Sequence, residues 1–238
     1  MLPYFYHPAL AIGQQETTLD EATSKHCIQV LRMNVGEQLL LTDGRGLLAQ
    51  ASIAVPDRKH CRVCLARVDV LPPRPRQLTL AVAFTKNSSR NEWLLEKATE
   101  LGVEHIVPIS CKRSEKDKFN QERWQGILVS AMLQSQQAFL PKLHPVLPFG
   151  SLPSLQVVGG QHFIAHCIGG GVRRSYTQSM DKEKNAVILI GPEGDFTEQE
   201  VAQALAWGFA PVVMGPNRLR TETAALYACT VFNALVYG

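Results

Sequence analysis

Two short loops near the C-terminus contain residues that could bind a small ligand through the backbone. The first is Gly191-Pro192-Glu193-Gly194, which follows an apolar run at 187–190. The second is Gly215-Pro216, which follows an apolar run at 212–214. Proline stiffens each loop, and glycine lets the backbone approach a ligand closely. Short apolar runs bounded by Gly and Pro are typical of buried strands, and α/β proteins bind ligands at the carboxyl ends of such strands. We therefore expect the active site at these two loops.

The charges of the first loop favour a neutral or cationic ligand. Glu193 and Asp195 lie within or next to the loop, which has no lysine or arginine. Carboxylates repel polyphosphates, and phosphate-binding loops normally supply a cation. Neither GxxxxGK[ST] nor GxGxxG after a strand occurs in the chain. S-adenosylmethionine, which carries a sulfonium, would suit this loop. By spacing alone, two tight turns that bind nothing are an equally good interpretation.

The elements that position these loops alternate between strands and helices from residue 77 onward. Strands are expected at 78–84, 105–109, 162–167, 187–190 and 212–214. Helices are expected to begin with capping boxes at Ser89 and Thr197, and with Asn120 as the cap of a long helix through Ala138. Gly102 would end the first of these helices. This alternation predicts an α/β fold with a parallel sheet covered on both faces.

The last predicted helix, at 221–237, has almost no polar face. A helix that is apolar all round is buried all round. At the end of a chain of 238 residues, this favours a homodimer interface over a central core helix of a monomer.

The first seventy residues predict a small β-rich unit. A short helix is expected from Thr18, with Glu21 completing a capping box, through Leu31. Strands are expected at 38–42, 47–55 and 61–70. The prolines of Pro72-Pro73-Arg74-Pro75 cannot continue a helix or a central strand. We therefore predict domains at residues 1–71 and 77–238, joined by a Pro-rich linker at 72–76.

Composition and cysteine spacing narrow the class of protein. A hydrophobic content of 45% is typical of globular chains, and a net charge of +3 permits nucleic-acid binding without requiring it. We find no signal peptide and no run of membrane-spanning length, so we expect a cytoplasmic protein with no membrane partner. Cys61 and Cys64 would point to opposite faces of a strand. We therefore expect buried free thiols and no metal site.

Several motifs, in order along nearly the whole chain, resemble the RsmE family of RNA methyltransferases. The most specific is Leu219-Arg220-Thr221-Glu222-Thr223-Ala224 after the two loops. A second is the stretch at 96–103 followed by Pro108, and a third is His26 with Val30-Leu31-Arg32 and Gly36. Members of this family methylate N3 of uracil1498 in 16S ribosomal RNA and belong to the SPOUT superfamily.

The resemblance implies a fold and a set of partners. It implies an N-terminal PUA-like β-barrel that binds RNA and a C-terminal SPOUT-type α/β domain with a deep trefoil knot. It also implies S-adenosylmethionine bound in the knot, a homodimer, and 16S rRNA or the small ribosomal subunit as the partner. Periodicity would not have predicted the knot, because knots are nearly absent from proteins.

The resemblance also assigns residues to the site. Cofactor binding falls on Ile190, Gly191, Pro192, Glu193, Gly194, Met214, Gly215, Leu219 and Thr221. We hypothesise that Arg220 stabilises negative charge on the base as N3 loses its proton, and that Glu222 accepts or orients that proton. Glu222 also suits the first turn of a helix on electrostatic grounds alone. Glu193 is expected to brace its own loop.

Basic residues near the ends of the strands and in the N-terminal motif are expected to contact RNA. The predicted RNA-binding residues are His26, Arg32, Lys86, Arg90, Arg113 and Arg218, and we considered Lys112, Lys116 and Lys118 with them. Cations at these places would hold phosphates, although a single basic residue is more often a solvated surface group.

Two segments depart from the family pattern. The segment at 133–137 lacks the usual acid and arginine, and the cation of the second loop comes one place later, at Arg218. These departures affect how we expect the protein to bind the target nucleotide. Two other functions stay open: a SPOUT enzyme that modifies transfer RNA or another ribosomal site, and a catalytically idle RNA-binding protein.

Overall fold

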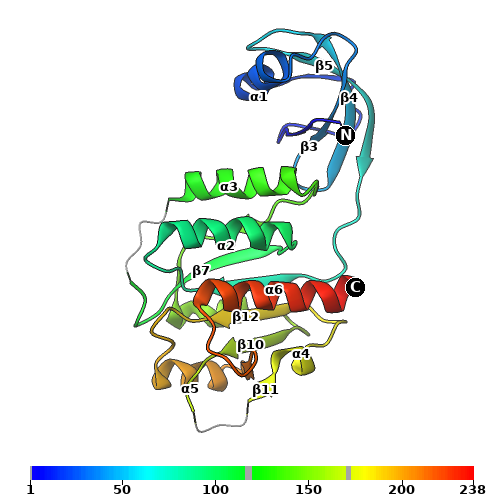
Figure 1. Cartoon of the computed structure of the whole chain (residues 1–238). Coiled ribbons are helices and arrows are strands. Elements are labelled where there is room, and N and C mark those ends of the chain that lie inside the picture. Colours follow the sequence, from blue (N-terminus) through cyan, green and yellow to red (C-terminus); the bar gives the residue numbers. More distant parts are fainter. Residues whose placement is uncertain (1, 116–119, 170–172) are drawn as a thin grey trace. The chain divides into compact units, whose positions relative to one another are not determined.

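The computed structural model describes residues 2–115, 120–169 and 173–238 (Figure 1). The chain divides into two compact units. The N-terminal unit comprises Met1–Pro73 with Met132–Leu140, and the C-terminal unit comprises Arg74–Ala131 with Pro141–Gly238. A short segment from the middle of the chain thus packs with the N-terminal unit. In this segment the Ala138 carbonyl accepts a hydrogen bond from the backbone N–H of Gly46 at 2.9 Å.

A five-stranded sheet in the order β1-β3-β4-β5-β2 forms the N-terminal unit. β1 and β3 are parallel, and the other neighbours are antiparallel. The strands are β1 (Tyr4–Tyr6), β2 (Glu16–Thr18), β3 (Gln38–Thr42), β4 (Leu47–Val55) and β5 (Arg62–Val70). Alternate residues of β3 and β4 are buried in one apolar core, as a half-buried sheet requires. The strands predicted at 38–42 and 47–55 are confirmed, and the third begins one residue later than predicted.

The short helix of the N-terminal unit begins later than predicted. Asp20, not Thr18, is its N-cap, and its carboxylate accepts a hydrogen bond from the backbone N–H of Thr23 at 2.9 Å. Thr18 is instead the last residue of β2. The helix α1 (Glu21–Lys25) continues into a π-helix, η1 (His26–Val30), so its end agrees with the prediction.

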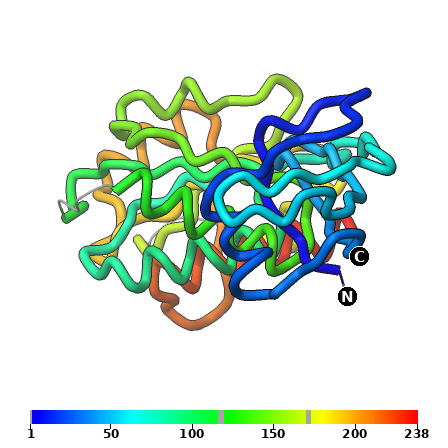
Figure 2. The backbone as a smooth tube through the Cα atoms, turned by 90° about the horizontal axis from the view of Figure 1, so that it is seen from above, coloured from blue at the N-terminus to red at the C-terminus, as the bar shows by residue number. Residues whose placement is uncertain are grey.

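A parallel sheet forms the centre of the C-terminal unit, as predicted. Its order is β11-β13-β10-β12-β6-β7-β8, β9 also pairs with β7, and all pairs are parallel. The strands are β6 (Leu78–Val82), β7 (His105–Ser110), β8 (Lys142–Leu143), β9 (Leu147–Pro148), β10 (Gln161–Ala165), β11 (Arg174–Ser175), β12 (Ala186–Ile190) and β13 (Ala210–Val213). The backbone path of the chain can be followed by colour in Figure 2.

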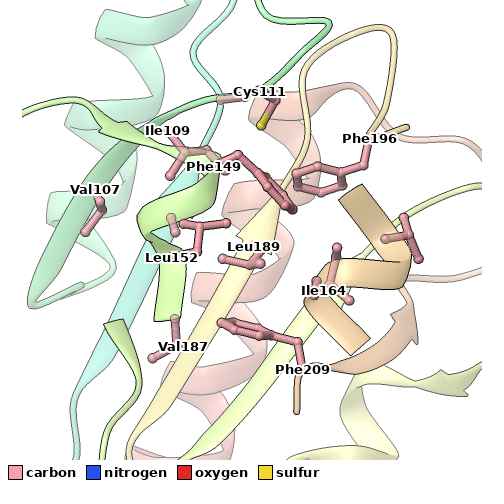
Figure 3. Close-up of a cluster of buried hydrophobic side chains, with 14 residues drawn as sticks. Val107, Ile109, Cys111, Phe149, Leu152, Ile164, Val187, Leu189, Phe196 and Phe209 are labelled. Atoms are coloured by element: carbon pink, nitrogen blue, oxygen red, sulfur yellow. The ribbon is translucent and has the colours of Figure 1, made fainter. Parts of the chain in front are cut away.

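Helices cover both faces of this sheet. They are α2 (Ser88–Glu100), α3 (Gln121–Gln134), the 3-10 helix η2 (Phe149–Leu155), α4 (Tyr176–Ser179), α5 (Glu198–Ala206) and α6 (Thr221–Tyr237). The last helix, α6, packs on α2, β6 and β12. Residues of η2 and α5 pack on the other face, where Phe149 and Phe196 lie close together over Leu189 (Figure 3). The predicted burial of both faces is confirmed.

Side-chain caps determine where the helices begin. Thr197 and Glu200 form the predicted capping box of α5. The predicted box at Ser89 is wrong, because Asn87 is the N-cap of α2 and accepts a hydrogen bond from the backbone N–H of Arg90. Asn120 caps the long helix as predicted, since its side chain accepts a hydrogen bond from Arg123. That helix ends at Gln134 rather than Ala138.

The cysteines are free thiols, as expected, but they are not all buried. Cys61 is buried, whereas Cys64 and Cys167 are exposed. Among the described residues, no group of three or more His, Cys, Asp or Glu side chains is placed to hold a metal ion. None of the helices within the described ranges is long and apolar enough to cross a membrane.

Candidate cofactor site

A cavity of about 480 Å³ lies at the carboxyl ends of β10, β12 and β13. Its volume is in the range of ligand-binding pockets. Residues from the ends of all three strands line it, together with the start of α6. They are Ala165, His166, Cys167, Arg173, Gly191, Pro192, Glu193, Asp195, Val212, Val213, Met214, Gly215, Pro216, Asn217, Arg218, Leu219, Arg220, Thr221 and Ala224.

The order of the sheet brings the two predicted loops to this cavity. β10 lies between β12 and β13, and Ala165 at its end is in register with both Ile190 and Val212. Because all three strands are parallel, the segments that follow them leave the same edge of the sheet. The first loop therefore lies on one side of the end of β10, and the second loop lies on the other.

Sequence reasoning missed the third wall of the cavity, which is formed by His166 and Cys167 after β10. The strand itself was predicted, at 162–167. The sequence did not show that this strand lies between the other two, because strand order depends on contacts between residues that are far apart in the sequence. Polar residues at the carboxyl end of a predicted parallel strand were the available signal.

Hydrogen bonds from outside the first loop hold it in place. The Thr221 hydroxyl donates to the Gly191 carbonyl at 2.9 Å, which ties the loop to the start of α6. The Arg113 guanidinium donates to the carbonyls of Gly194 at 2.7 Å and Phe196 at 3.3 Å. A Cβ at position 191 would lie 3.1 Å from the Phe196 ring. Glycine is therefore needed at 191 for close packing of the loop.

The cavity carries charges of both signs. The predicted carboxylates, Glu193 and Asp195, line it, but so do Arg173, Arg218 and Arg220. The first loop itself is acidic, as predicted, and the arginines of the wall come from other segments of the chain. The Asp195 carboxylate accepts a hydrogen bond from the backbone N–H of Cys167 at 2.7 Å. Within the described parts of the chain, Arg218 and Arg220 have no ion-pair partner.

His166 lines the cavity after the end of β10. Burial lowers the pKa of this side chain, and the nearby Arg173 guanidinium lowers it further, while Asp195 acts in the opposite direction. Its Nδ1 atom is buried and has no hydrogen-bond partner among the described residues.

Most of the predicted cofactor residues line the cavity, and two do not. The lining includes Gly191, Pro192, Glu193, Met214, Gly215, Leu219 and Thr221, and also the predicted catalytic residue Arg220. Ile190 is buried in β12. Gly194 lies against Arg113, since a Cβ at position 194 would be 3.4 Å from that side chain.

Glu222 is not part of the cavity wall. Its side chain is 9% exposed, and its Oε1 lies 3.7 Å from Nε of Arg90 on α2. Its Oε2 is buried without a partner among the described residues. Arg90, which we expected at the RNA, thus faces a buried carboxylate in the first turn of α6, where the helix dipole favours negative charge.

The other predicted RNA-binding residues have varied surroundings. Lys86 forms an exposed ion pair with Glu115 at 3.4 Å, and Arg113 braces the first loop. In the N-terminal unit, His26 packs edge-on against Phe5, and Arg32 has a positive φ of 56°. Of the basic residues considered with them, Lys112 donates its backbone N–H to Glu200, and Lys116 and Lys118 lie outside the described residues.

The chain matches two family models. One is described as an RNA methyltransferase domain and matches residues 72–233, and the other is described as an RNA methyltransferase PUA domain and matches residues 19–63. The chain is also 30% identical to the ribosomal RNA small subunit methyltransferase E of Synechocystis sp., an alignment that covers 94% of this chain and 75% of that protein.

Solved structures agree with this match. A crystal structure of a probable rRNA-methyltransferase from Porphyromonas gingivalis superposes with a TM-score of 0.91 at 39% identity and covers 98% of both chains. The ribosomal RNA small subunit methyltransferase E of Neisseria gonorrhoeae, solved bound to S-adenosylmethionine, superposes with a TM-score of 0.87 at 28% identity and covers 99% of this chain and 98% of that one. The chain belongs to the ribosomal RNA small subunit methyltransferase E family, with a PUA domain and an RNA methyltransferase domain.

Proposed function

We propose that this protein transfers the methyl group of S-adenosylmethionine to N3 of a uridine in 16S rRNA of the small ribosomal subunit, at the position that corresponds to uracil1498. The cavity at the ends of β10, β12 and β13 is the main support for this proposal. It combines two loops that expose backbone groups, the carboxylates of Glu193 and Asp195, and the Arg220 guanidinium, which has no ion-pair partner among the described residues. The relative from Neisseria gonorrhoeae, which was crystallised with S-adenosylmethionine, supports the choice of cofactor.

The residues of the cavity fit this cofactor. The backbones of Gly191, Pro192, Met214 and Gly215 line the cavity and are proposed to hold adenine and ribose, and the Glu193 carboxylate suits the ammonium of the methionine end. S-adenosylmethionine supplies an electrophilic methyl group when bound, and the protein supplies alignment.

Arg220 is the residue that we propose for stabilising the reacting base. Uracil N3 must lose its proton before or during methylation, and the negative charge then spreads to the neighbouring carbonyl oxygens. A guanidinium held at the cavity favours that charge more strongly than water does. We propose that Glu222 acts as an orienter rather than in contact with the base, because it lies beside Arg90 and outside the lining.

The N-terminal residues are proposed to hold the RNA. We propose an RNA-binding domain at 1–71, a linker at 72–76 and a methyltransferase domain at 77–238. The PUA match at 19–63 supports the first domain, and the match at 72–233, which includes the proposed linker, supports the second. We propose contacts to phosphates or bases from His26, Arg32 and Lys86. The proposed location is the cytoplasm, where ribosomal subunits are assembled.

The test of this function is methyl incorporation followed by mapping of the modified nucleotide. Purified protein, radiolabelled S-adenosylmethionine and small subunits that lack the modification should give one methyl per 16S rRNA, at N3 of a single uridine. Label in transfer RNA or at another ribosomal position would favour a different SPOUT activity. Cofactor binding tests the idle RNA-binding alternative, because such a protein need not bind S-adenosylmethionine.

We expect S-adenosylmethionine to protect Cys167 from alkylation. This exposed thiol lines the cavity, so a bound cofactor would block access to it. At about ten times the dissociation constant, the rate of reaction with iodoacetamide should fall about tenfold. Cys64, the exposed thiol of the N-terminal unit, is the internal control and should react at an unchanged rate. Equal rates at Cys167 with and without cofactor would contradict binding at this cavity, and mass spectrometry of the two peptides measures both rates.

A homodimer formed through α6 is also proposed. The helix buries one side on α2, β6 and β12, but Leu235 and Tyr237 each remain 39% exposed. Trp93 of the neighbouring helix α2 is 46% exposed. Large apolar side chains at an exposed helix face are typical of a subunit interface.

Replacing Leu235 by Glu is expected to convert the dimer into a monomer. The carboxylate would have to be buried without a partner in the interface, which costs more than the exposed apolar contact contributes. Light scattering after size exclusion should give half of the wild-type mass. Leu205 on α5 is exposed to a similar degree, 44%, so Leu205→Glu is the matched control and should remain dimeric. A Leu235→Glu protein of unchanged mass would contradict an interface at α6.

The trefoil knot is a further proposal. β13 lies near one edge of the sheet, beyond β10, whereas α6 packs on β6 and β12 nearer its centre. The segment between β13 and α6 therefore returns past β10, and this return supports the proposed knotted path of the SPOUT superfamily.

A further inference from the structure

Asp195 lies at a backbone position that favours glycine. Its φ is +62°, and among the non-glycine residues described only Arg32 and Gln136 share a positive φ. Left-handed backbone costs most L-residues free energy, although Asp and Asn tolerate it better than others. Glycine would therefore serve the turn at least as well. The carboxylate at this position needs a reason other than the shape of the loop.

The carboxylate of Asp195 points toward the end of β10. Its Oδ2 accepts the backbone N–H of Cys167 at 2.7 Å, and its Oδ1 accepts the N–H of Phe196 at 2.8 Å. The residue lines the cavity. Asp195 is in none of the ion pairs of the described residues. Its negative charge is therefore oriented by hydrogen bonds, and no cation of the described residues forms an ion pair with it.

The neighbouring wall does not cancel this charge. His166 is held toward its neutral form, because burial and the Arg173 guanidinium lower the pKa of its imidazole. Arg173 itself donates to the His166 carbonyl. Arg218 and Arg220 line the cavity from the second loop and the segment after it. Arg173 at the end of β10 and Arg113 beside the first loop partly offset the charge of Asp195, but neither forms an ion pair with it among the described residues.

We infer that Asp195 determines the preference of this cavity for the charged methyl donor over the neutral reaction product. This inference rests on the proposed cofactor. S-adenosylmethionine carries a sulfonium, an ammonium and a carboxylate, for a net charge of +1. S-adenosylhomocysteine has a neutral thioether and no net charge. The two molecules otherwise share their adenosine and amino-acid parts.

The physical reason is that only the sulfonium differs between the two ligands. A fixed carboxylate in a cavity attracts the sulfonium more strongly than it would in water. The cavity has a lower effective dielectric constant than water, and salt ions screen charges inside it less. The guanidinium groups attract the carboxylate that both ligands share and repel the sulfonium, so they act against the preference that we assign to Asp195. Asp195 therefore lowers product inhibition, since it holds the substrate selectively and lets the product leave.

A purely structural role for Asp195 is the alternative that the test must separate from this one. The residue could serve only as a brace between the first loop and the end of β10. In that case the loss of Asp195 would weaken the binding of both ligands by the same factor, because both ligands contact the same loop.

The test compares the binding of three ligands by isothermal titration calorimetry to wild-type protein and to Asp195→Asn. Asparagine keeps the size, tolerates the positive φ and retains one oxygen that can accept from Cys167. Its amide nitrogen cannot accept from Phe196, so the charge and one local hydrogen bond are lost, and the affinity for S-adenosylhomocysteine reports the effect of that bond. The ligands are S-adenosylmethionine, S-adenosylhomocysteine and sinefungin, in which an ammonium on carbon replaces the methylated sulfonium. Glu198→Gln, on the exposed start of α5 outside the cavity, removes the same net charge and is the matched control.

The expected result is a five- to tenfold loss of affinity for S-adenosylmethionine and sinefungin, about the effect of one partly screened charge pair a few ångströms apart. Affinity for S-adenosylhomocysteine should change less than about twofold, and Glu198→Gln should change none of the three. Equal losses for all three ligands would assign Asp195 a bracing role only and overturn the inference. Wild-type protein that binds none of them would instead contradict the proposed function.

Discussion

Arg220→Ala is expected to lower the rate of methyl transfer by about 10²- to 10³-fold, the usual effect of removing one electrostatic stabiliser of a transition state. Arg220 lines the cavity at the start of α6 and has no ion-pair partner within the described residues. Its loss leaves no buried charge unpaired, so the fold should survive. Single-turnover assays with small subunits and saturating cofactor measure the change. The affinity for S-adenosylmethionine, measured separately, should stay within about threefold.

Two further variants make this result specific. Arg220→Lys keeps the positive charge but loses the planar fork of donors, so it should recover only part of the rate. Arg174→Ala removes an exposed cation of β11 outside the cavity and should leave transfer near the wild-type rate. If the Arg220→Ala protein transferred methyl groups at the wild-type rate, Arg220 would have no role in the mechanism.

Phe196→Ala is expected to destabilise the protein by about 3–5 kcal/mol, the usual cost of deleting a buried aromatic side chain. Phe196 is fully buried, packs 5.9 Å from Phe149 between ring centroids, and lies behind Gly191 in the first loop. The midpoint of thermal unfolding should fall by roughly 10 °C for a chain of this size. The first loop should also loosen, because its packing surface is lost, so affinity for S-adenosylmethionine should fall with stability.

A matched core variant separates the two effects of this change. Phe209 is also buried, but it packs against His162, away from the first loop. Phe209→Ala should lower the melting midpoint by a similar amount while leaving cofactor affinity intact at temperatures where the protein is folded. If both variants reduced affinity equally, general destabilisation rather than loosening of the first loop would be the cause.

The strands and helix ends that depend on local sequence were predictable. The apolar runs of β12 and β13 and the capping box of α5 are local signals, and each agrees with the structure within a few residues. The start of α2 was missed because Asn87 and Ser89 compete as caps and only tertiary structure decides between them. The same holds for Thr18, which pairs in β2 instead of capping a helix.

The site was predictable only where its residues are adjacent in the sequence. The Gly and Pro pattern identified both loops, and the motif around Arg220 identified the start of α6. The wall at His166, the bracing of Gly194 by Arg113 and the pairing of Arg90 with Glu222 join segments that lie far apart in the sequence. Such contacts follow from strand order and helix packing, and no local pattern of residue types encodes them.

A crystal structure of the protein with S-adenosylmethionine tests the central claim most directly. The cofactor is predicted to lie between the first loop at 191–194 and the second loop at 214–216, in contact with the end of β10, with its methyl group facing the side of the cavity that Arg220 lines. Density for the cofactor at any other place, or in this cavity with Arg220 turned away and the methyl group enclosed by protein, would contradict the assignment of this cavity as the methyl-transfer site.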